Sequence, residues 1–293
     1  MLSKLRHYSG DYPEAGLEIG QAAVDPGPLL EYLGSDPDTL TRLRIGTLGV
    51  CFTVGGAGRR ACFLKSHATL AGRRALDKEI SLFQMAYPRV RVDRFECSDR
   101  LWMVADVLST PIVAPGVADM LATISQYEAR LSSDACVSCL APGDDMQALL
   151  CEAEEALARL ASSSHIGTAV ARQATLHLHR LKQVVPSMSP VVCHGDLGPA
   201  NLMCDAEGLI AVDWEDAFLG VAGYDFLYWL TFFDNRKYLG EQIFGRTPWT
   251  KEIDVALITM ILLLKCELSV RAGRLMGNVL SFDQRLGEIF VLV

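Results

Sequence analysis

The sequence has no excess of positive charge. Its 293 residues include 27 Lys and Arg against 35 Asp and Glu, which gives a formal net charge of −8. A protein whose main partner is a nucleic acid needs positive charge concentrated on its binding face, so the composition argues against that class of function. The acidity is compatible with a cationic substrate, although a solvated acidic surface explains it equally well.

The sequence also lacks the long apolar segments of a membrane protein. Its first residues contain no apolar core of the kind found in a secretory signal peptide. The longest apolar helical stretch, Val255–Leu264, is bounded by charged residues and is too short to span a bilayer. We interpret it as a buried helix and expect no membrane partner.

Signals for disulfides and for zinc are weak. The cysteines number nine, and several lie within apolar runs, as buried free thiols do. The single C-x-x-C motif, Cys136-Val-Ser-Cys139, has no second pair, no nearby pair of histidines and no thioredoxin-like context. We therefore expect a reduced, cytoplasmic protein in which this motif binds no zinc.

The most informative part of the chain is the segment V-V-C-H-G-D-L-G-P-A-N-L-M-C-D-A-E-G-L-I-A-V-D-W-E. Apolar Val191–Cys193 predicts a short buried strand that runs into a loop. Leu202–Cys204 and Leu209–Val212 predict the two strands of a hairpin, joined by a turn at 205–208. Strands would therefore hold the polar residues of this segment in fixed loops.

Three of those polar residues have the chemistry that phosphoryl transfer requires. Asp196 and Asn201 lie on the first loop, and Asp213 lies where the second hairpin strand ends. A carboxylate can orient an acceptor hydroxyl, while an amide oxygen and a second carboxylate can bind Mg²⁺. The alternative is a loop whose Asp and Asn side chains only form turns, which the ordered set disfavours.

The order and spacing of these residues resemble the catalytic and metal loops of the aminoglycoside phosphotransferase and choline kinase-like family, distant relatives of the protein kinases. The pattern of that family is H-x-D-x-x-x-x-N, then a hydrophobic strand, then I-D-W/F-E or a close variant. This chain matches it at His194, Asp196, Asn201, Asp213, Trp214 and Glu215. The resemblance implies that Asp196 is the catalytic base and that Asn201 and Asp213 are metal ligands. Glu215 is a possible metal or substrate contact.

Two further residues are expected to support the catalytic loop. The family carries an Asp near position 225 that hydrogen-bonds the loop backbone, and Asp225 would have that structural role here. His194 is expected to pack and to form hydrogen bonds rather than to transfer protons.

A second group of candidates lies nearer the N-terminus. Lys65 ends an apolar strand, Ala61–Leu64, from which a long cationic side chain can reach phosphates. Glu79 lies in Ala71–Tyr87, a segment with helical apolar spacing. The two residues match the strand lysine and helix glutamate of the kinase pattern, and we expect them to form an ion pair. Taken alone, a Lys at a strand end is more typical of a surface residue.

Glycines near residue 50 indicate a phosphate-binding loop. Gly46, Thr47 and Gly49 precede a strand-like run; the glycines would let backbone N–H groups approach phosphates, and Thr47 would add a hydroxyl. The loop resembles that of the family only in location and is not a Walker A motif. Gly55–Gly58 lies between two strand-like runs and is typical of a hairpin turn.

Leu101–Leu108 predicts a further strand, followed by a connection that contains Pro and Gly. In the kinase pattern this connection is the hinge, whose backbone groups hydrogen-bond the adenine edge. We therefore expect the base of a nucleotide to bind around Val104 and Val107.

Strands dominate the first part of the chain and helices the second, which predicts an α+β protein. Helical apolar spacing recurs in Met146–Ala161, Ala169–Val184, Tyr224–Leu239 and Glu252–Leu275. The resemblance implies a bilobal, protein kinase-like fold. Its expected parts are a β-rich N-lobe with one helix at 1–108, a hinge at 109–116 and a mainly helical C-lobe at 117–293, which holds the catalytic and metal loops and the acceptor site.

The activity that the resemblance implies is Mg²⁺-dependent transfer of the γ-phosphoryl group of ATP, or of another nucleoside triphosphate, to a hydroxyl of a small molecule. Family members act on aminoglycosides, choline, ethanolamine, homoserine, sugars and macrolides; the acceptor and the oligomeric state are open here. Asp213-Trp-Glu replaces the D-F-G of protein kinases, and no A-P-E follows. The alternative function is a catalytically silent nucleotide-binding regulator, which would usually have lost one of the residues that the chemistry needs.

Candidates for the acceptor site are fewer. An amine-bearing acceptor would favour acidic residues such as Asp144, Asp145, Asp234 and Glu241, although each can equally be a solvated acid. A neutral acceptor would favour aromatic residues such as Trp229 and Phe232.

Overall fold

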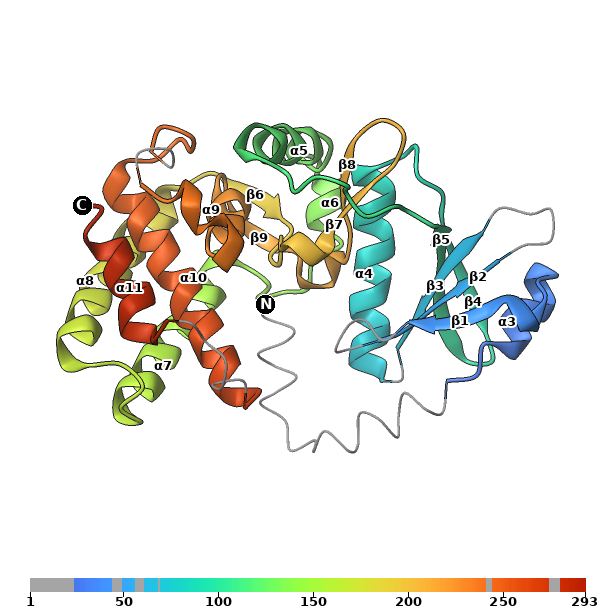
Figure 1. The fold of residues 1–293 in the computed structure, drawn as a ribbon, viewed down its shortest axis with the longest axis horizontal. Helices are drawn as coiled ribbons and strands as arrows, with labels where there is room; N and C mark the ends of the chain where they lie inside the picture. Colours follow the sequence, from blue (N-terminus) through green and yellow to red (C-terminus); the bar gives the residue numbers. More distant parts are fainter. Residues whose placement is uncertain (1–23, 44–48, 56–60, 68, 241–243, 274–279) are drawn as a thin grey trace.

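The computed structural model of this protein describes residues 24–43, 49–55, 61–67, 69–240, 244–273 and 280–293. Figure 1 shows a β-sheet with its helices at one end of the molecule and a group of helices at the other, with short strands between them. Strands come first along the chain and helices later, which confirms the α+β class.

The sheet has five strands in the order β1-β2-β3-β5-β4, and all neighbours are antiparallel. The strands are β1 (Leu40–Leu43), β2 (Val50–Val54), β3 (Cys62–Ser66), β4 (Val92–Cys97) and β5 (Arg100–Asp106). Successive side chains of a strand face opposite sides, so Lys65 faces one side of the sheet, with its cross-strand partner Met103, and Leu64 faces the other. Leu64 packs with Val104 and with the short helix α3 (Gly27–Leu33).

Helix α4 (Leu70–Ala86) covers the face of the sheet that carries Lys65 (Figure 1). The Thr69 side chain caps its first turn by accepting a hydrogen bond from Gly72 N at 3.1 Å. Leu76, Ile80 and Phe83 are buried at helical spacing, and Glu79 is buried beside them. The predicted helix is thus present, within a residue of its expected ends.

The helices of the second part enclose a long apolar helix. They are α5 (Val117–Arg130), α6 (Asp134–Val137), α7 (Met146–Ser162), α8 (Thr168–Val184), α9 (Tyr224–Leu230), α10 (Lys251–Arg271) and α11 (Phe282–Phe290). Helix α10 contains the apolar stretch Val255–Leu264 and packs against α7, α8 and α11 (Figure 1). Every residue of this stretch is buried, as expected. Among the described residues, no helix is both long enough and apolar enough to cross a membrane.

Two small antiparallel sheets lie between the two parts. Strand β6 (Pro190–Cys193) pairs with β9 (Phe218–Val221), and β7 (Leu202–Cys204) pairs with β8 (Leu209–Ala211). The predicted strand and hairpin are confirmed, whereas β9 was not predicted. Short 3₁₀ helices complete the fold at Pro37–Thr39, Val185–Ser187, Pro199–Asn201, Trp214–Asp216 and Phe233–Tyr238.

The prediction of one continuous helix over Tyr224–Leu239 is wrong, because α9 ends at Leu230. Thr231 Oγ1 donates a hydrogen bond to Tyr228 O at 2.6 Å, and Asn235 Nδ2 donates to Trp229 O at 2.9 Å. These side chains satisfy carbonyls that a continuing helix would have used. The backbone is extended at Phe232 (ψ 146°), and the chain resumes as a 3₁₀ helix.

Candidate active site

Asp225 holds the start of the loop that follows β6. Its carboxylate accepts hydrogen bonds from His194 N at 2.7 Å, from Gly195 N at 3.0 Å and from the Tyr127 hydroxyl at 2.6 Å. Gly195 has φ +83°, and a Cβ atom there would lie 2.2 Å from Asp216 O, so only glycine fits this turn. The structural role expected of Asp225 is confirmed.

His194 is fully buried, and backbone groups contact both of its ring nitrogens. Nδ1 accepts from Asp196 N at 3.3 Å, while Nε2 lies 2.9 Å from Val212 O. A carbonyl oxygen can only accept, so the neutral tautomer with the proton on Nε2 fits both contacts. The ring also packs on Trp214, with 4.7 Å between centroids. These contacts confirm that His194 packs and hydrogen-bonds.

Asp196 and Asn201 are bound to each other within the loop. Asn201 Nδ2 donates to Asp196 O at 2.8 Å and lies 3.4 Å from Asp196 Oδ2. Asn201 O accepts from Val212 N at 2.9 Å, which ties the loop to the residue before Asp213. The Asn201 amide oxygen is the atom that could bind a cation, because its nitrogen is the donor to Asp196.

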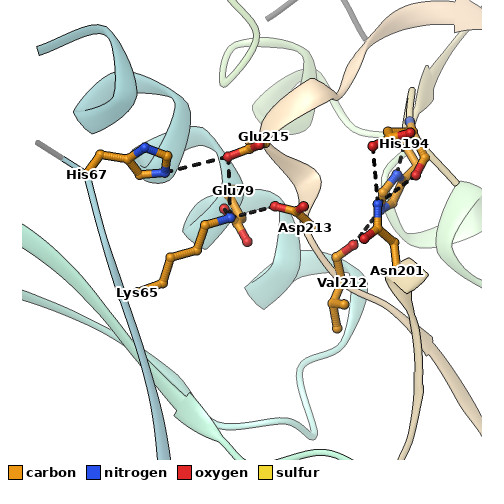
Figure 2. A network of polar contacts seen from close by, with 9 residues as sticks. Lys65, His67, Glu79, His194, Asn201, Val212, Asp213 and Glu215 are labelled. Atoms are coloured by element: carbon orange, nitrogen blue, oxygen red, sulfur yellow. Dashed lines mark hydrogen bonds and ion pairs between the residues drawn. The ribbon is translucent and has the colours of Figure 1, made fainter. Parts of the chain in front are cut away.

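Lys65 forms ion pairs with three carboxylates (Figure 2). Its Nζ atom lies 2.7 Å from Glu79 Oε2, 2.5 Å from Asp213 Oδ1 and 3.4 Å from Glu215 Oε2. The expected pair with Glu79 is present. The contacts with Asp213 and Glu215 were not predicted, and they join the sheet and α4 to the segment after β8.

The group contains one cationic and three acidic side chains, and this imbalance shifts the pKa values of Lys65 and Glu79. Burial disfavours the charge of Lys65, but Asp213, Glu215 and Glu79 together raise its pKa well above the usual value. Burial, helped by Asp213 and Glu215, raises the pKa of Glu79 to about 8, although Lys65 opposes the shift. One lysine therefore does not compensate all three carboxylates, and the excess of acid keeps a proton on Glu79 up to about pH 8. The group thus favours a further positive charge.

The residues present can hold a divalent cation. The carboxylate oxygens of Glu79, Asp213 and Glu215 lie within 4.8 Å of one another. Oxygen donors of this kind are the ligands that Mg²⁺ prefers. Asp213 has φ 71° and ψ 57°, a left-handed conformation that non-glycine residues rarely adopt and that is often found at functional sites.

His67 is a member of the group that the sequence did not reveal. Its Nε2 atom lies 3.5 Å from Glu215 Oε2, and its side chain is buried (Figure 2). Gly49 packs against it: a Cβ atom at Gly49 would lie 3.1 Å from His67 Nε2. Of the candidate phosphate loop, Gly46 and Thr47 lie outside the described residues, so only Gly49 is placed. No sequence signal distinguished His67, which follows a strand end like many surface histidines.

The structure distinguishes the two residues, Val104 and Val107, at which we expected the base of a nucleotide to bind. Strand β5 lies between β3 and β4, so the backbone groups of Val104 are paired within the sheet. Its side chain packs toward α3, away from Lys65. The chain leaves the sheet after Asp106, and Val107 is 46% exposed. Val104 is therefore unsuitable for binding a base, whereas Val107 remains a candidate.

Most of the residues considered for the acceptor site contact other side chains or backbone, are buried, or lie outside the described residues. Asp144 lies 3.4 Å from Lys78 Nζ, and Asp145 caps α7 by accepting from Ala148 N at 2.8 Å. Asp234 is exposed, and Glu241 lies outside the described residues. Trp229 is buried within the core, and the ring of Phe232 packs on the loop after β6 at Gly198.

All cysteines are free thiols, including Cys136 and Cys139. Cys136 is buried, with its sulfur 3.4 Å from Met85 Sδ. The C-x-x-C motif is thus part of the packing between α6 and α4.

Comparison with known proteins agrees with this geometry. Residues 106–245 match the model of the phosphotransferase enzyme family. A search of curated proteins gave no match.

Solved structures share the fold at low sequence identity. A variant of aminoglycoside 2'-phosphotransferase-IIIa in complex with GDP has a TM-score of 0.63 at 15% identity, over 91% of this chain and 94% of that chain. A choline/ethanolamine kinase family protein from Mesorhizobium loti has a TM-score of 0.60 at 16% identity, over 95% and 92%. A macrolide 2'-phosphotransferase from Brachybacterium faecium has a TM-score of 0.59 at 16% identity, over 89% and 96%.

These likenesses confirm the bilobal, protein kinase-like fold. Together with the family match, they confirm the resemblance to the aminoglycoside phosphotransferase and choline kinase-like family.

Proposed function

We propose that this protein is a Mg²⁺-dependent kinase that transfers the γ-phosphoryl group of ATP, or of another nucleoside triphosphate, to a hydroxyl of a small molecule. One observation carries the proposal. Lys65 of the sheet binds Asp213, and the residue before Asp213 is hydrogen-bonded to the loop that holds Asp196 and Asn201. The groups that phosphoryl transfer needs are thus brought together from distant parts of the chain.

In this proposal Lys65 binds the phosphates of the nucleotide, and Glu79 directs its side chain. Lys65 contacts Asp213, so phosphate binding would draw its amine away from that carboxylate. Gly49, next to His67, would bring backbone groups toward the phosphates. The backbone after Asp106, at Val107, would bind the base.

Asn201 and Asp213 would hold Mg²⁺, with Glu215 as a possible further contact. The unbalanced carboxylates around Lys65 support this assignment. When bound, Mg²⁺ neutralises charge on the β- and γ-phosphate oxygens. Asp213 would become available to a cation as Lys65 turns to the phosphates.

Asp196 would orient the acceptor hydroxyl and take its proton late in the reaction. The transition state of phosphoryl transfer is loose, so most of the rate enhancement comes from positioning and charge neutralisation. The Asn201 contacts with Asp196 support such a positioned base. The acceptor we propose is an aminoglycoside-like antibiotic or another hydroxylated or amine-bearing metabolite. Free thiols throughout the chain fit a reducing compartment, and we place the protein in the cytoplasm.

Two measurements test the function. Thermal shifts with ATP and GTP, with and without Mg²⁺, test nucleotide binding, since a ligand of the native state raises its stability. Nucleotide consumption is then measured across aminoglycosides, macrolides, choline, ethanolamine and sugars, with ³¹P NMR of the products. Acceptor-dependent formation of a phosphate ester is the expected result.

The matched control is Asp196→Asn, which should bind nucleotide without turnover. Nucleotide binding without consumption for any acceptor would favour the regulatory alternative, a silent nucleotide-binding protein of the same fold.

A further inference from the structure

The carboxylate of Asp196 also accepts a hydrogen bond from a residue outside the motif that contains it. The Tyr228 hydroxyl, from α9, donates to Asp196 Oδ1 at 2.5 Å. Asn201 Nδ2 lies 3.4 Å from the other oxygen, Oδ2. Tyr228 is only 3% exposed. Burial and the neighbouring Asp196 charge raise the pKa of Tyr228 well above its usual value, so the phenol stays protonated and remains a donor.

Tyr228 is in turn held by Lys265 of α10. Lys265 Nζ lies 4.1 Å from the centroid of the Tyr228 ring and 3.4 Å from that of Phe232. It also donates to Thr231 Oγ1 at 2.8 Å. An ammonium group over aromatic faces is attracted to their negative potential, so the cation fixes both rings.

The second ring also contacts the catalytic loop. A Cβ atom at Gly198 would lie 2.6 Å from Phe232 Cζ. Lys265 therefore fixes two rings that touch the loop at two points, Asp196 and Gly198. The two rings also contact each other edge to face, with 5.7 Å between their centroids.

We propose that Tyr228, fixed by Lys265, is a positioning residue that sets the rotation of the Asp196 carboxylate. In this orientation Oδ1 binds Tyr228, and Oδ2 receives the acceptor hydroxyl. The inference rests on the proposed phosphotransfer function. The terminal torsion of an Asp side chain is broad, so a carboxylate without a fixed donor can rotate. A hydrogen bond from a buried phenol to a carboxylate is strong and directional. A carboxylate oxygen accepts more than one hydrogen bond, so Oδ2 can receive the acceptor while it contacts Asn201.

The direct test is Tyr228→Phe, which removes a single oxygen atom. We expect kcat to fall about 10- to 100-fold, because a misplaced catalytic group costs rates of this order. The KM for nucleotide should change less than about two-fold, since Tyr228 lies on the Asp196 side of the site.

The matched control is Tyr224→Phe. Tyr224 is buried one turn earlier in α9 and stacks on Tyr228 with 6.1 Å between centroids. Its hydroxyl has no hydrogen-bond partner among the described residues. Removing it should leave kcat near that of the wild type. Equal losses in the two variants would indicate a general effect on packing and would overturn the positioning role.

A second variant tests whether Lys265 acts through Tyr228. Lys265→Met keeps the apolar stem and removes the cation, so it should lower kcat in the wild-type background. In the Tyr228→Phe background the same substitution should lower kcat by a smaller factor than in the wild type, because coupled residues are not additive; the remaining effect would act through Phe232. Lys265→Arg should retain more activity than Lys265→Met, since it keeps the cation. Fully additive losses in the double variant would remove Lys265 from the proposal.

A crystallographic comparison makes the test independent of turnover. In the wild type, Asp196 should have one orientation, with Oδ1 on the Tyr228 hydroxyl; in Tyr228→Phe the carboxylate should rotate or occupy several orientations. An unchanged Asp196 in the variant would overturn the inference even if phosphotransfer is established. Conversely, if the wild type phosphorylates no acceptor, the proposed function fails, while this comparison still decides whether Tyr228 orients Asp196.

Discussion

Lys65 and Asp213 are 148 residues apart in the sequence, yet they form an ion pair with 2.5 Å between Nζ and Oδ1. This contact joins β3 to the segment after β8, and it brings together the residue that we propose for phosphate binding and one that we propose for metal binding. In the proposed function Lys65 would bind phosphate and Asp213 would bind the cation, so the two side chains would separate when those ligands bind.

Asp213→Asn should lower turnover by at least about 100-fold with the fold intact, because it removes one charge from the proposed metal site without a change of volume. Kinetics at increasing Mg²⁺ and a circular dichroism spectrum would measure the two effects. Asp93→Asn is the control; this half-buried carboxylate of β4 pairs only with Arg91 among the ion pairs of the described residues. Turnover within a few-fold of the wild type would contradict the assignment of Asp213.

Lys65→Ala should weaken productive use of ATP strongly, and Glu79→Ala should do so more mildly, because Lys65 can still reach phosphate without its partner. The Lys65 and Glu79 side chains are in direct contact, so their effects should not add. The measurement is kcat/KM for ATP in both single variants and in the double variant. A double variant as impaired as the summed single effects would show that the pair does not act as a unit.

The stability of the nucleotide-free protein should depend on the ionisation of Glu79. Its pKa is about 8 in the folded protein, against 4.5 ordinarily. The folded state thus retains a proton that the unfolded state loses. Stability should therefore fall as the pH rises from about 4.5 to about 8.

Glu79→Gln removes that titration while keeping a similar shape. Its melting temperature should rise relative to the wild type by more at pH 8 than at pH 5, while its KM for ATP increases. Thermal unfolding at the two pH values measures this. A difference in melting temperature that is the same at both would exclude Glu79 as the titrating group.

Asp225→Asn should destabilise the protein by about 3 kcal/mol, because it takes a charge from a buried acceptor of three hydrogen bonds and places N–H donors against N–H donors. Tyr127→Phe removes one of the three donors and should cost about 1 kcal/mol. Urea unfolding of both variants measures the difference. Equal free energies of unfolding would indicate that the contacts to His194 and Gly195 contribute little.

The sequence by itself determined the features that depend on local spacing. Alternation and apolar runs predicted the hairpin of β7 and β8, and helical spacing predicted α4 with Glu79 on its buried face. The ordered motif around Asp196 predicted a loop of fixed shape, which Asp225 and Asn201 hold through hydrogen bonds. Each of these is encoded within a few turns or a single hairpin, where side-chain direction follows from the period of the backbone.

Local spacing did not predict where polar side chains end a helix by binding its carbonyls, or which strand lies in the middle of the sheet. The apolar pattern continues past Leu230, but Thr231 and Asn235 bind the last carbonyls of α9 and end it. Val104 lies at the expected position along the chain, but β5 pairs with both β3 and β4, so the backbone groups of Val104 are already hydrogen-bonded within the sheet.

Only the tertiary structure decided which distant side chains meet. Asp213 and Glu215 reach Lys65 because α4 packs on the segment after β8, and Lys265 reaches Tyr228 because α10 packs on α9. No sequence spacing specifies such contacts, since they depend on how whole helices and sheets pack. The sequence thus determined the chemical groups of the site, and the packing of its elements decided how those groups are paired.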